Sequence, residues 1–258
     1  MRPRDPAQPN TEDGRKVTVA STPIQGILFD KDGTLVDYDK TWAPLNRQVA
    51  ALAAQGDPDL AARLLEIGGY DVEADRVVGG SLLAASHTQE IAAAWIEAGA
   101  KHELAALTRA MDEIFAAGAQ HAVPVTDVAD LFRRLRSRGL ALGVATSDGE
   151  AAARATLARL GVETDDLFVA GYDSGFGGKP KPGMVEGFCR AMGLPAGAVA
   201  VVGDNLHDLE MAHAAGCAAA IGVLSGTATA DELAHRASAV IASIAELEAL
   251  LDRWPVPA

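Results

Sequence analysis

The sequence predicts an α/β protein whose parallel sheet is interrupted by an all-helical insertion. Short apolar stretches at residues 24–29, 140–145 and 198–202 are rich in Ile, Val and Leu, which is typical of strands buried on both faces. Strand-like and helix-like segments alternate from residue 126 onward, and this alternation favours right-handed βαβ units. Residues 39–121 break the rhythm, because they are rich in Ala, Leu, Glu and Gln and contain no long β-branched run.

The remaining elements of the α/β part follow from apolar spacing and from glycines. Gly139, Gly161 and Gly216 each follow a segment of helical periodicity, where glycine favours the end of a helix. The predicted helices cover residues 128–135, 150–160, 184–192, 208–215 and 242–254, and the predicted strands cover residues 24–29, 140–145, 167–170, 198–202 and 218–223.

We expect three parts along the chain. Residues 1–20 contain prolines and acidic residues without an apolar core, which predicts a flexible N-terminal extension and not a secretory signal. Residues 21–38 and 122–258 form the α/β core, and residues 39–121 form a helical cap. Because the cap follows the first strand, we expect it to cover the catalytic edge of the sheet as a lid. Its tryptophans, Trp42 and Trp95, are expected to fill its core and not to stack on a ligand.

Composition excludes several classes of function. A formal net charge of -13 argues against nucleic-acid binding, which needs basic stripes. No apolar stretch approaches the roughly 18 residues that a membrane span requires. Cys189 and Cys217 form no CxxC pair, so we expect both to pack as small apolar side chains in a cytoplasmic protein. The expected assembly is a monomer or a homodimer.

Polar residues follow three of the predicted strands. Asp30 and Asp32 end the first strand, Thr146 follows residues 140–145, and Asp204 follows residues 198–202. The carboxyl ends of parallel strands share one edge of the sheet, which is where ligands bind in open α/β sheets. We therefore expect these side chains to converge although they lie far apart in sequence.

Together with Lys179, the converging residues indicate phosphoryl transfer. A divalent metal held by carboxylates cancels the repulsion between a phosphate ester and an attacking carboxylate. Asp30 is the predicted nucleophile and forms an aspartyl-phosphate, while Asp32 acts first as general acid and then as general base. Asp204 completes a magnesium site, and Lys179 balances charge on the nucleophile and on the phosphoryl group.

Other residues support this site. Thr146 and the backbone at Ser147 are expected to donate hydrogen bonds to phosphate oxygens at a helix N-terminus. Gly33 lets the backbone approach the phosphate, and Asp208 supports the metal waters or pairs with Lys179.

Each of these residues alone also fits an ordinary structural role. Asp32 and Gly33 form a common turn pair, Thr146 fits a helix N-cap, and Lys179 fits an exposed loop. One site explains the whole set better than several unrelated roles do. His207 and His213 are expected to face solvent or to pack, and not to act in catalysis.

With these motifs, the chain resembles the haloacid dehalogenase (HAD) superfamily of phosphohydrolases, and within it the phosphoglycolate phosphatase branch. Residues 30–34 match DxDGT, Thr146 matches the second motif, residues 179–182 match KPxP, and residues 203–208 match GDxxxD. The resemblance spans residues 24–251. It implies a Rossmann-like core with an inserted helical cap, an aspartyl-phosphate intermediate, and Mg2+ bound by Asp30, Asp204 and the backbone carbonyl of Asp32.

Departures from the family pattern limit what the resemblance implies. Asp148 places a negative charge near the phosphate and argues against tight binding of highly charged substrates. Dehalogenases lack an acid at the position of Asp32, so dehalogenation is not expected. Phosphonoacetaldehyde hydrolases also lack that acid and need a cap lysine, for which the insertion offers only Lys40 and Lys101.

The sequence therefore predicts a Mg2+-dependent phosphatase of small phosphorylated metabolites, with 2-phosphoglycolate as the substrate that the resemblance suggests. A phosphomutase of the β-phosphoglucomutase type is the alternative, and the intact acid pair argues against a noncatalytic binding module. Cap side chains are expected to select the substrate. Five basic residues are candidates for gripping a carboxylate, and their spacing favours none of them: Arg47, Arg63, Arg76, Lys101 and Arg109.

Overall fold

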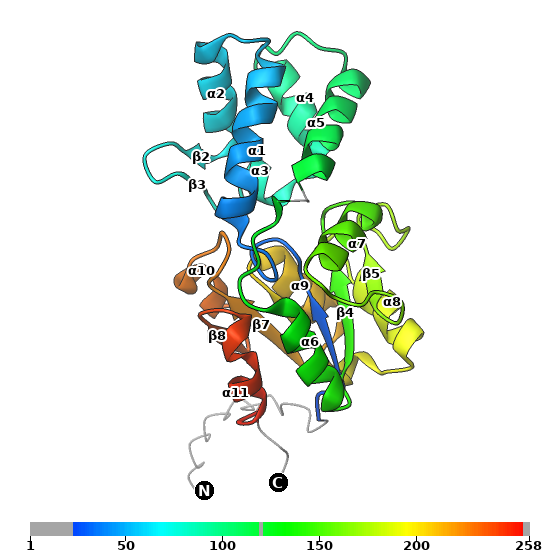
Figure 1. Cartoon of the computed structure of the whole chain (residues 1–258). Helices are drawn as coiled ribbons and strands as arrows, with labels where there is room; N and C mark the ends of the chain where they lie inside the picture. Colours follow the sequence, from blue (N-terminus) through cyan, green and yellow to red (C-terminus); the bar gives the residue numbers. More distant parts are fainter. Residues whose placement is uncertain (1–22, 119–120, 255–258) are drawn as a thin grey trace, which may run out of the picture.

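A six-stranded parallel sheet forms the lower part of the molecule, and a helical domain stands above it (Figure 1). The computed structural model describes residues 23–118 and 121–254, so the expected extension at residues 1–20 lies outside the described residues. The α/β fold with a parallel sheet is as the sequence predicted.

The sheet brings the three motif-bearing strands together at its centre. Its order is β5-β4-β1-β6-β7-β8, and all pairs are parallel. Phe29 in β1 lies opposite Val144 in β4 and Val202 in β6, so these three strands end level with one another. The strands are β1 (Gly26–Phe29), β4 (Ala141–Ala145), β5 (Phe168–Ala170), β6 (Val199–Gly203), β7 (Ala219–Val223) and β8 (Ala239–Ile241).

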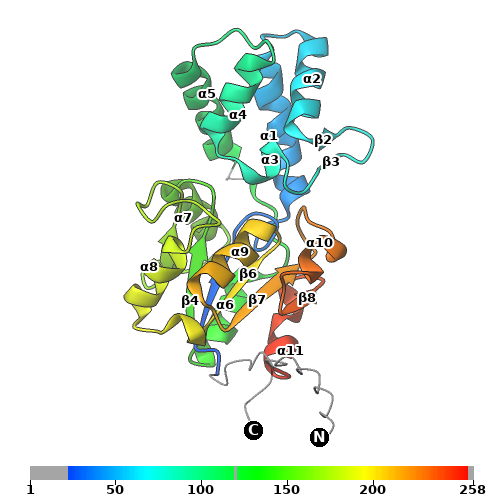
Figure 2. The same ribbon diagram turned by 180° about the vertical axis from the view of Figure 1, so that it is seen from behind.

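Helices cover both faces of the sheet, which explains why its strands are apolar throughout. Ile27 and Phe29 pack with α6, α7 and α11 on one face, and Leu28 packs with α8, α9 and α10 on the other, which faces the viewer in Figure 2. The helices of this part are α6 (Val128–Ser137), α7 (Glu150–Arg159), α8 (Gly183–Met192), α9 (Leu206–Ala215), α10 (Ala230–Ala234) and α11 (Leu247–Leu251), with 3-10 turns η2 (Ala196–Ala198) and η3 (Ile244–Glu246).

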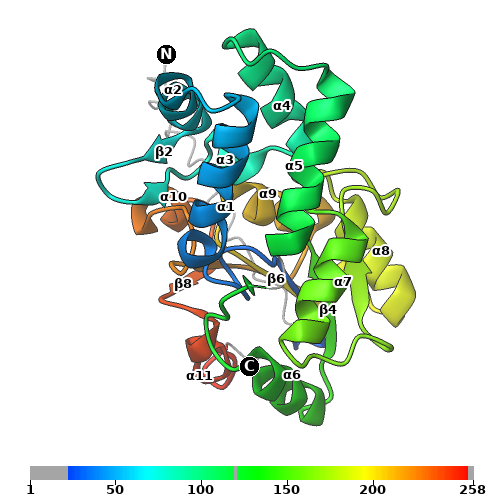
Figure 3. The same ribbon diagram turned by 45° about the horizontal axis from the view of Figure 1, so that its top comes forward.

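The helical domain has a separate apolar core, which supports the proposed division into core and cap. Trp95 is fully buried within it, as expected, and Leu107 and Met111 pack in the same cluster. Figure 3, tilted so that the top comes forward, shows α1 and α5 between the viewer and the sheet. The cap elements are α1 (Tyr38–Ala53), α2 (Pro58–Gly68), β2 (Tyr70–Asp71), β3 (Arg76–Val77), α3 (Leu82–Ala85), α4 (Thr88–Glu97) and α5 (Leu104–Gly118).

Local signals set many of the helix ends. The side chain of Asp37 accepts a hydrogen bond from the backbone N–H of Lys40 and caps α1. The three glycines predicted to end helices, Gly139, Gly161 and Gly216, have φ of 79°, 75° and 72°, the left-handed region in which glycine is favoured.

Short elements differ from the sequence expectations. The strand β8 follows β7 at the sheet edge, although residues 218–223 were expected to be the last strand. The expected closing helix over residues 242–254 is divided into η3 and the short helix α11. The cap also contains the antiparallel pair β2–β3. Two or three residues are too few to show a period of two, so the sequence pattern cannot reveal such strands.

Within residues 23–118 and 121–254, none of the helices combines the length and the apolarity that a membrane span requires.

Candidate active site

The ends of β1, β4 and β6 bring Asp30, Thr146 and Asp204 to one place on the sheet edge. Asp30 is 7% exposed, Thr146 1% and Asp204 3%. All three line one cleft between the sheet and the cap, together with Asp32, Lys179 and His207. The structure therefore brings together the residues that the strand ends predicted. His207 lines the cleft as well, whereas the ring of His213 hydrogen-bonds the backbone carbonyl of Arg236.

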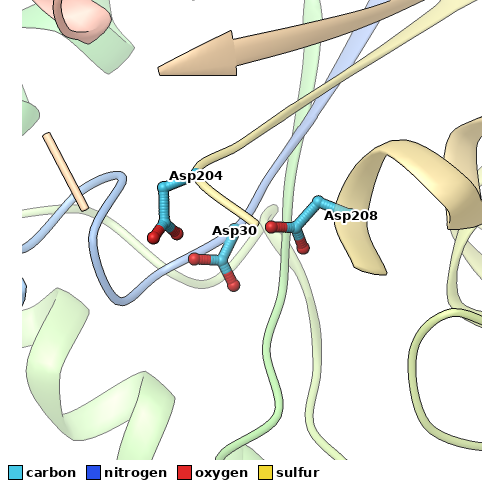
Figure 4. Close-up of side chains that lie close together, drawn as sticks. All are labelled: Asp30, Asp204 and Asp208. Carbon is cyan, nitrogen blue, oxygen red and sulfur yellow. The ribbon is translucent and has the colours of Figure 1, made fainter. Parts of the chain in front are cut away.

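Three carboxylates form the centre of the site. Asp30, Asp204 and Asp208 each place an oxygen within 4.8 Å of the others, and Figure 4 shows the three side chains converging from two strand ends and the first turn of α9. Burial, followed by the charge of Asp208, raises the pKa of Asp204 to about 7. Burial also raises the pKa of Asp30 well above its usual range. The site therefore needs positive charge if all three groups are to ionise.

Lys179 supplies one positive charge to this cluster. Its Nζ donates to Asp30 and, at 2.6 Å, to Asp208 Oδ1. Burial alone would lower the pKa of Lys179, but the carboxylates of Asp208 and Asp30 outweigh it, and the pKa lies above its usual value. The lysine is thus a fixed cation, and it faces three carboxylates.

Two carboxylate oxygens of the cluster have no hydrogen-bond partner in the described part of the chain. Asp208 accepts from Lys179 through Oδ1 and from the backbone N–H of Asn205, at 3.1 Å, through Oδ2. Asp204 Oδ2 accepts from the backbone of Thr227 at 2.8 Å, and Asp30 Oδ1 accepts from Lys179. Asp30 Oδ2 and Asp204 Oδ1 are the two oxygens left without a partner there. Hard oxygen donors in a buried, negatively charged site fit a divalent cation such as Mg2+.

Asp32 lies beside the cluster and is held by the cap and by its own neighbour. Its Oδ1 accepts a 2.6 Å hydrogen bond from Trp42 Nε1 and a 2.7 Å hydrogen bond from Lys31 Nζ. Lys31 is itself buried, and its Nζ lies 3.4 Å from Asp148 Oδ2. The carboxylate of Asp32 is therefore absent from the carboxylate cluster, although it lines the same cleft. No role was predicted for Lys31. Its position between Asp30 and Asp32 is the sequence signal that could have indicated an ion pair with a carboxylate.

The segments that follow β4 and β1 offer hydrogen-bond donors for a phosphate group. The backbone N–H groups of Ser147 and Asp32 donate to no acceptor among residues 23–118 and 121–254. Thr146 Oγ1 accepts from the backbone N–H of Asp148 at 3.1 Å, which leaves its own proton for a ligand. The negative charge of Asp148, which the sequence placed near the phosphate, is balanced by Lys31.

Comparison with known proteins identifies the family. A protein-family model described as haloacid dehalogenase-like hydrolase matches residues 24–216. The chain belongs to this family. A phosphoglycolate phosphatase from Yersinia pestis is 31% identical over 203 residues, which cover 75% of this chain and 78% of that protein. Enolase-phosphatase E1 from Sorangium cellulosum is 29% identical over 227 residues, 84% of this chain and 95% of that protein.

Solved structures agree with this assignment. CbbY from Rhodobacter sphaeroides in complex with phosphate has a TM-score of 0.68 at 25% identity, covering 89% of this chain and 99% of that chain. A hydrolase from Pseudomonas syringae has a TM-score of 0.67 at 21% identity, covering 90% and 99%, and shows the shared fold. The protein is therefore a HAD-type phosphatase that is similar to phosphoglycolate phosphatases.

In this HAD phosphatase the loop after β7 holds Asp204 in position. This role of the loop was not predicted from the sequence. Ser225 Oγ donates to the carbonyl of Gly33 at 2.8 Å, and a Cβ on Gly33, whose φ is +84°, would lie 2.5 Å from Asp204. A Cβ on Gly226 would lie 1.9 Å from Asp204 Oδ2. Two glycines thus leave room for one carboxylate. The sequence signal is weak, because an isolated glycine after a strand is common in loops.

We expect Gly226→Ala to displace Asp204 and to lower kcat by about a hundredfold, the order of magnitude that a 1 Å misplacement of a reacting group costs. Gly197→Ala is the matched control, because a Cβ there meets nothing within 4 Å. Phosphate release from p-nitrophenyl phosphate with Mg2+ measures the effect. Equal rates for the two variants would show that Asp204 does not need this close fit.

The five basic cap residues proposed to grip a carboxylate do not line the cleft. Arg47 pairs with Asp75 and Tyr70 on the β2–β3 side of the cap, and Arg63 donates to the carbonyl of Ala98. That expectation was wrong, because spacing along helices could not show which face of the cap meets the sheet. Trp42 does line the cleft, although it packs in the cap core as well.

Proposed function

We propose that this HAD phosphatase hydrolyses monoesters of small phosphorylated metabolites through an aspartyl-phosphate on Asp30, with Mg2+ as cofactor. The observation that carries the proposal is the arrangement at the end of β1. Asp30 is buried beside Lys179 and two further carboxylates, while Asp32, two residues later, stands apart from them in the same cleft. A nucleophile and a separate acid are what a two-step hydrolysis requires.

In the first step, an oxygen of Asp30 attacks phosphorus and the ester P–O bond breaks. Asp32 lies two residues from the nucleophile and gives its proton to the leaving oxygen. Lys179 and the free N–H groups of Asp32 and Ser147 stabilise negative charge on the phosphoryl oxygens. In the second step, Asp32 takes a proton from water while the water oxygen attacks phosphorus. The bond between phosphorus and the Asp30 oxygen breaks, which releases phosphate and restores the Asp30 carboxylate.

Asp30 and Asp204 would hold Mg2+ through their unpaired oxygens, and the family resemblance adds the backbone carbonyl of Asp32. The bound ion supplies charge that offsets the repulsion between the carboxylate and the phosphate. Asp208 pairs with Lys179 and accepts from the backbone N–H of Asn205 at the start of α9, so we assign it a supporting role.

We expect the full-length protein to release inorganic phosphate from p-nitrophenyl phosphate with Mg2+, and to lose at least about a hundredfold of its rate in excess chelator. Added Mg2+ should restore the rate. It should also raise the unfolding midpoint of the parent, because an ion that binds only the folded state stabilises it. Asp204→Asn should remove that rise. Full activity in excess chelator would contradict the metal role, and isomerised sugar phosphate without phosphate release would favour the mutase alternative.

A further inference from the structure

None of the described cap residues that line the cleft is a lysine or an arginine. Among the described residues that line the cleft, Lys179 is the one lysine or arginine, and it belongs to the sheet side. Its Nζ already donates to Asp30 and Asp208. The sheet side also carries five carboxylates, of which Asp32 and Asp148 share one buried lysine, Lys31. A substrate carboxylate would therefore meet like charge and no free cation.

Such a mismatch matters energetically. A carboxylate that is buried without a paired cation or enough hydrogen bonds is disfavoured, because water solvates it far better. His87, which also lines the cleft, stacks on Tyr172 with ring centroids 5.9 Å apart and lies 3.5 Å from Glu90. The carboxylate of Glu90 is therefore the charged group beside this imidazole, and His207 is the second imidazole that lines the cleft. The cleft is thus built for a leaving group without charge.

The cap wall nearest the reacting atoms is aromatic. Trp42 and Phe115 both line the cleft and meet edge to face, with ring centroids 5.6 Å apart. The indole of Trp42 donates through Nε1 to Asp32, the proposed acid. Because Asp32 must meet the leaving oxygen, the group attached to that oxygen lies against this aromatic pair. Apolar surface gains free energy when such a wall removes it from water.

One polar group of the wall has no partner in the described part of the chain. Asn46 lies one helical turn after Trp42 on α1, lines the cleft, and is only 3% exposed. Its Nδ2 makes no hydrogen bond of normal geometry there. The Tyr38 hydroxyl is its polar neighbour: burial raises the pKa of that hydroxyl, and the Asn46 side chain partly offsets the rise. A buried donor without an acceptor destabilises the free cleft, so a ligand oxygen that reaches Asn46 recovers this loss.

We propose that the substrate is a phosphate monoester of an uncharged alcohol or phenol, with an apolar or aromatic part against Trp42 and Phe115 and a neutral oxygen acceptor at Asn46. The inference rests on the proposed function, because it assigns the leaving group of the same reaction. It separates this chain from the phosphoglycolate phosphatases that it resembles, whose named substrate carries a carboxylate.

Two pairs of esters that differ only in charge test the proposal. The first pair is 4-carbamoylphenyl phosphate and 4-carboxyphenyl phosphate, and the second is the amide of 2-phosphoglycolate and 2-phosphoglycolate itself. At pH 8 with Mg2+, where imidazoles are generally neutral, we expect the amide of each pair to have a kcat/KM at least about tenfold higher. Equal or faster turnover of the acids would overturn the assignment. Failure of the proposed function is a different result, namely no phosphate release from either member of a pair.

Variants of the wall give the second test. Asn46→Leu should reduce the ratio of kcat/KM between 4-carbamoylphenyl phosphate and phenyl phosphate by about tenfold, because phenyl phosphate offers no acceptor. Phe115→Arg should shift the ratio between acid and amide toward the acid. Val72→Arg is the matched control, because it adds the same charge to the cap at a side chain that is 68% exposed and outside the cleft. If Phe115→Arg and Val72→Arg change the ratio equally, the cap wall does not set the charge preference.

Discussion

Replacing Asp30 with asparagine is expected to abolish phosphate release. Asparagine keeps the shape of the side chain at a position that is only 7% exposed, but its amide is a poor nucleophile. Turnover should fall by at least about 10^4, as it does when a covalent nucleophile is removed from other hydrolases. The fold should persist, because burial raises the pKa of Asp30 and a neutral group there carries no desolvation cost. We expect the free energy of unfolding to change by less than about 1 kcal/mol.

The measurement has two parts. Phosphate release from p-nitrophenyl phosphate gives the rate, and acid quench during turnover gives the protein-bound phosphate, which should be present in the parent and absent from Asp30→Asn. Asp165→Asn is the control, because it makes the same change at an exposed position of the α/β core. If Asp30→Asn kept more than about one hundredth of the parental rate, Asp30 would not be the nucleophile.

The sequence predicted the part of the site that depends on strands. A buried parallel strand has a strong apolar pattern, and its carboxyl end falls on a known edge of the sheet. Asp30, Thr146 and Asp204 could therefore be placed together before the strand order was known. The observed order, with β1 between β4 and β6, places these ends side by side.

Other features of the site depend on tertiary approach. Asp208 joins the carboxylate cluster and pairs with Lys179, which is one of the two roles that the sequence suggested for it. The side chain of Asp32 is held outside the cluster by Trp42 and Lys31. The close fit of Gly226 around Asp204 arises between loops that follow different strands. No local pattern reports such contacts, since they join residues far apart in the chain.

In the cap, too, the sequence pattern predicted the local structure but not the tertiary contacts. Its helical periodicity predicted its helices and its buried Trp95, but periodicity identifies a buried face without saying what covers it. Arg47 looked available for a ligand, whereas in the structure it pairs with Asp75 on the cap itself. The uncharged wall that meets the cleft could be found only after α1 and α5 were placed over the sheet edge. Substrate preference is therefore the property that the sequence left open.

Lys179→Met should produce the second large effect, on both activity and stability. Methionine has a similar volume but removes the one cation that touches Asp30 and Asp208 within residues 23–118 and 121–254. The side chain of Lys179 is only 4% exposed. Breaking a buried ion pair in this way costs about 3–5 kcal/mol, because the partner carboxylates stay buried without compensation. Turnover should fall by about 10^2 to 10^3, the order of magnitude expected when one preorganised charge is lost from the transition state.

Two further variants show whether the effect of Lys179 comes from its charge or from its shape. Lys181→Met removes a lysine from the same loop at an exposed position and should leave kcat and the unfolding midpoint near those of the parent. Lys179→Arg keeps the charge, but its planar guanidinium does not fit a site shaped for an ammonium between two carboxylates, so it should recover stability more than activity. Mg2+ should restore part of the stability of Lys179→Met, since the ion binds the same carboxylates in the folded state alone. A rate of Lys179→Met within tenfold of the parental rate would contradict the expected role of Lys179 in turnover. The buried lysine would then serve only to hold Asp30 and Asp208 together. The charge that stabilises the phosphoryl group would have to come from the metal and the backbone.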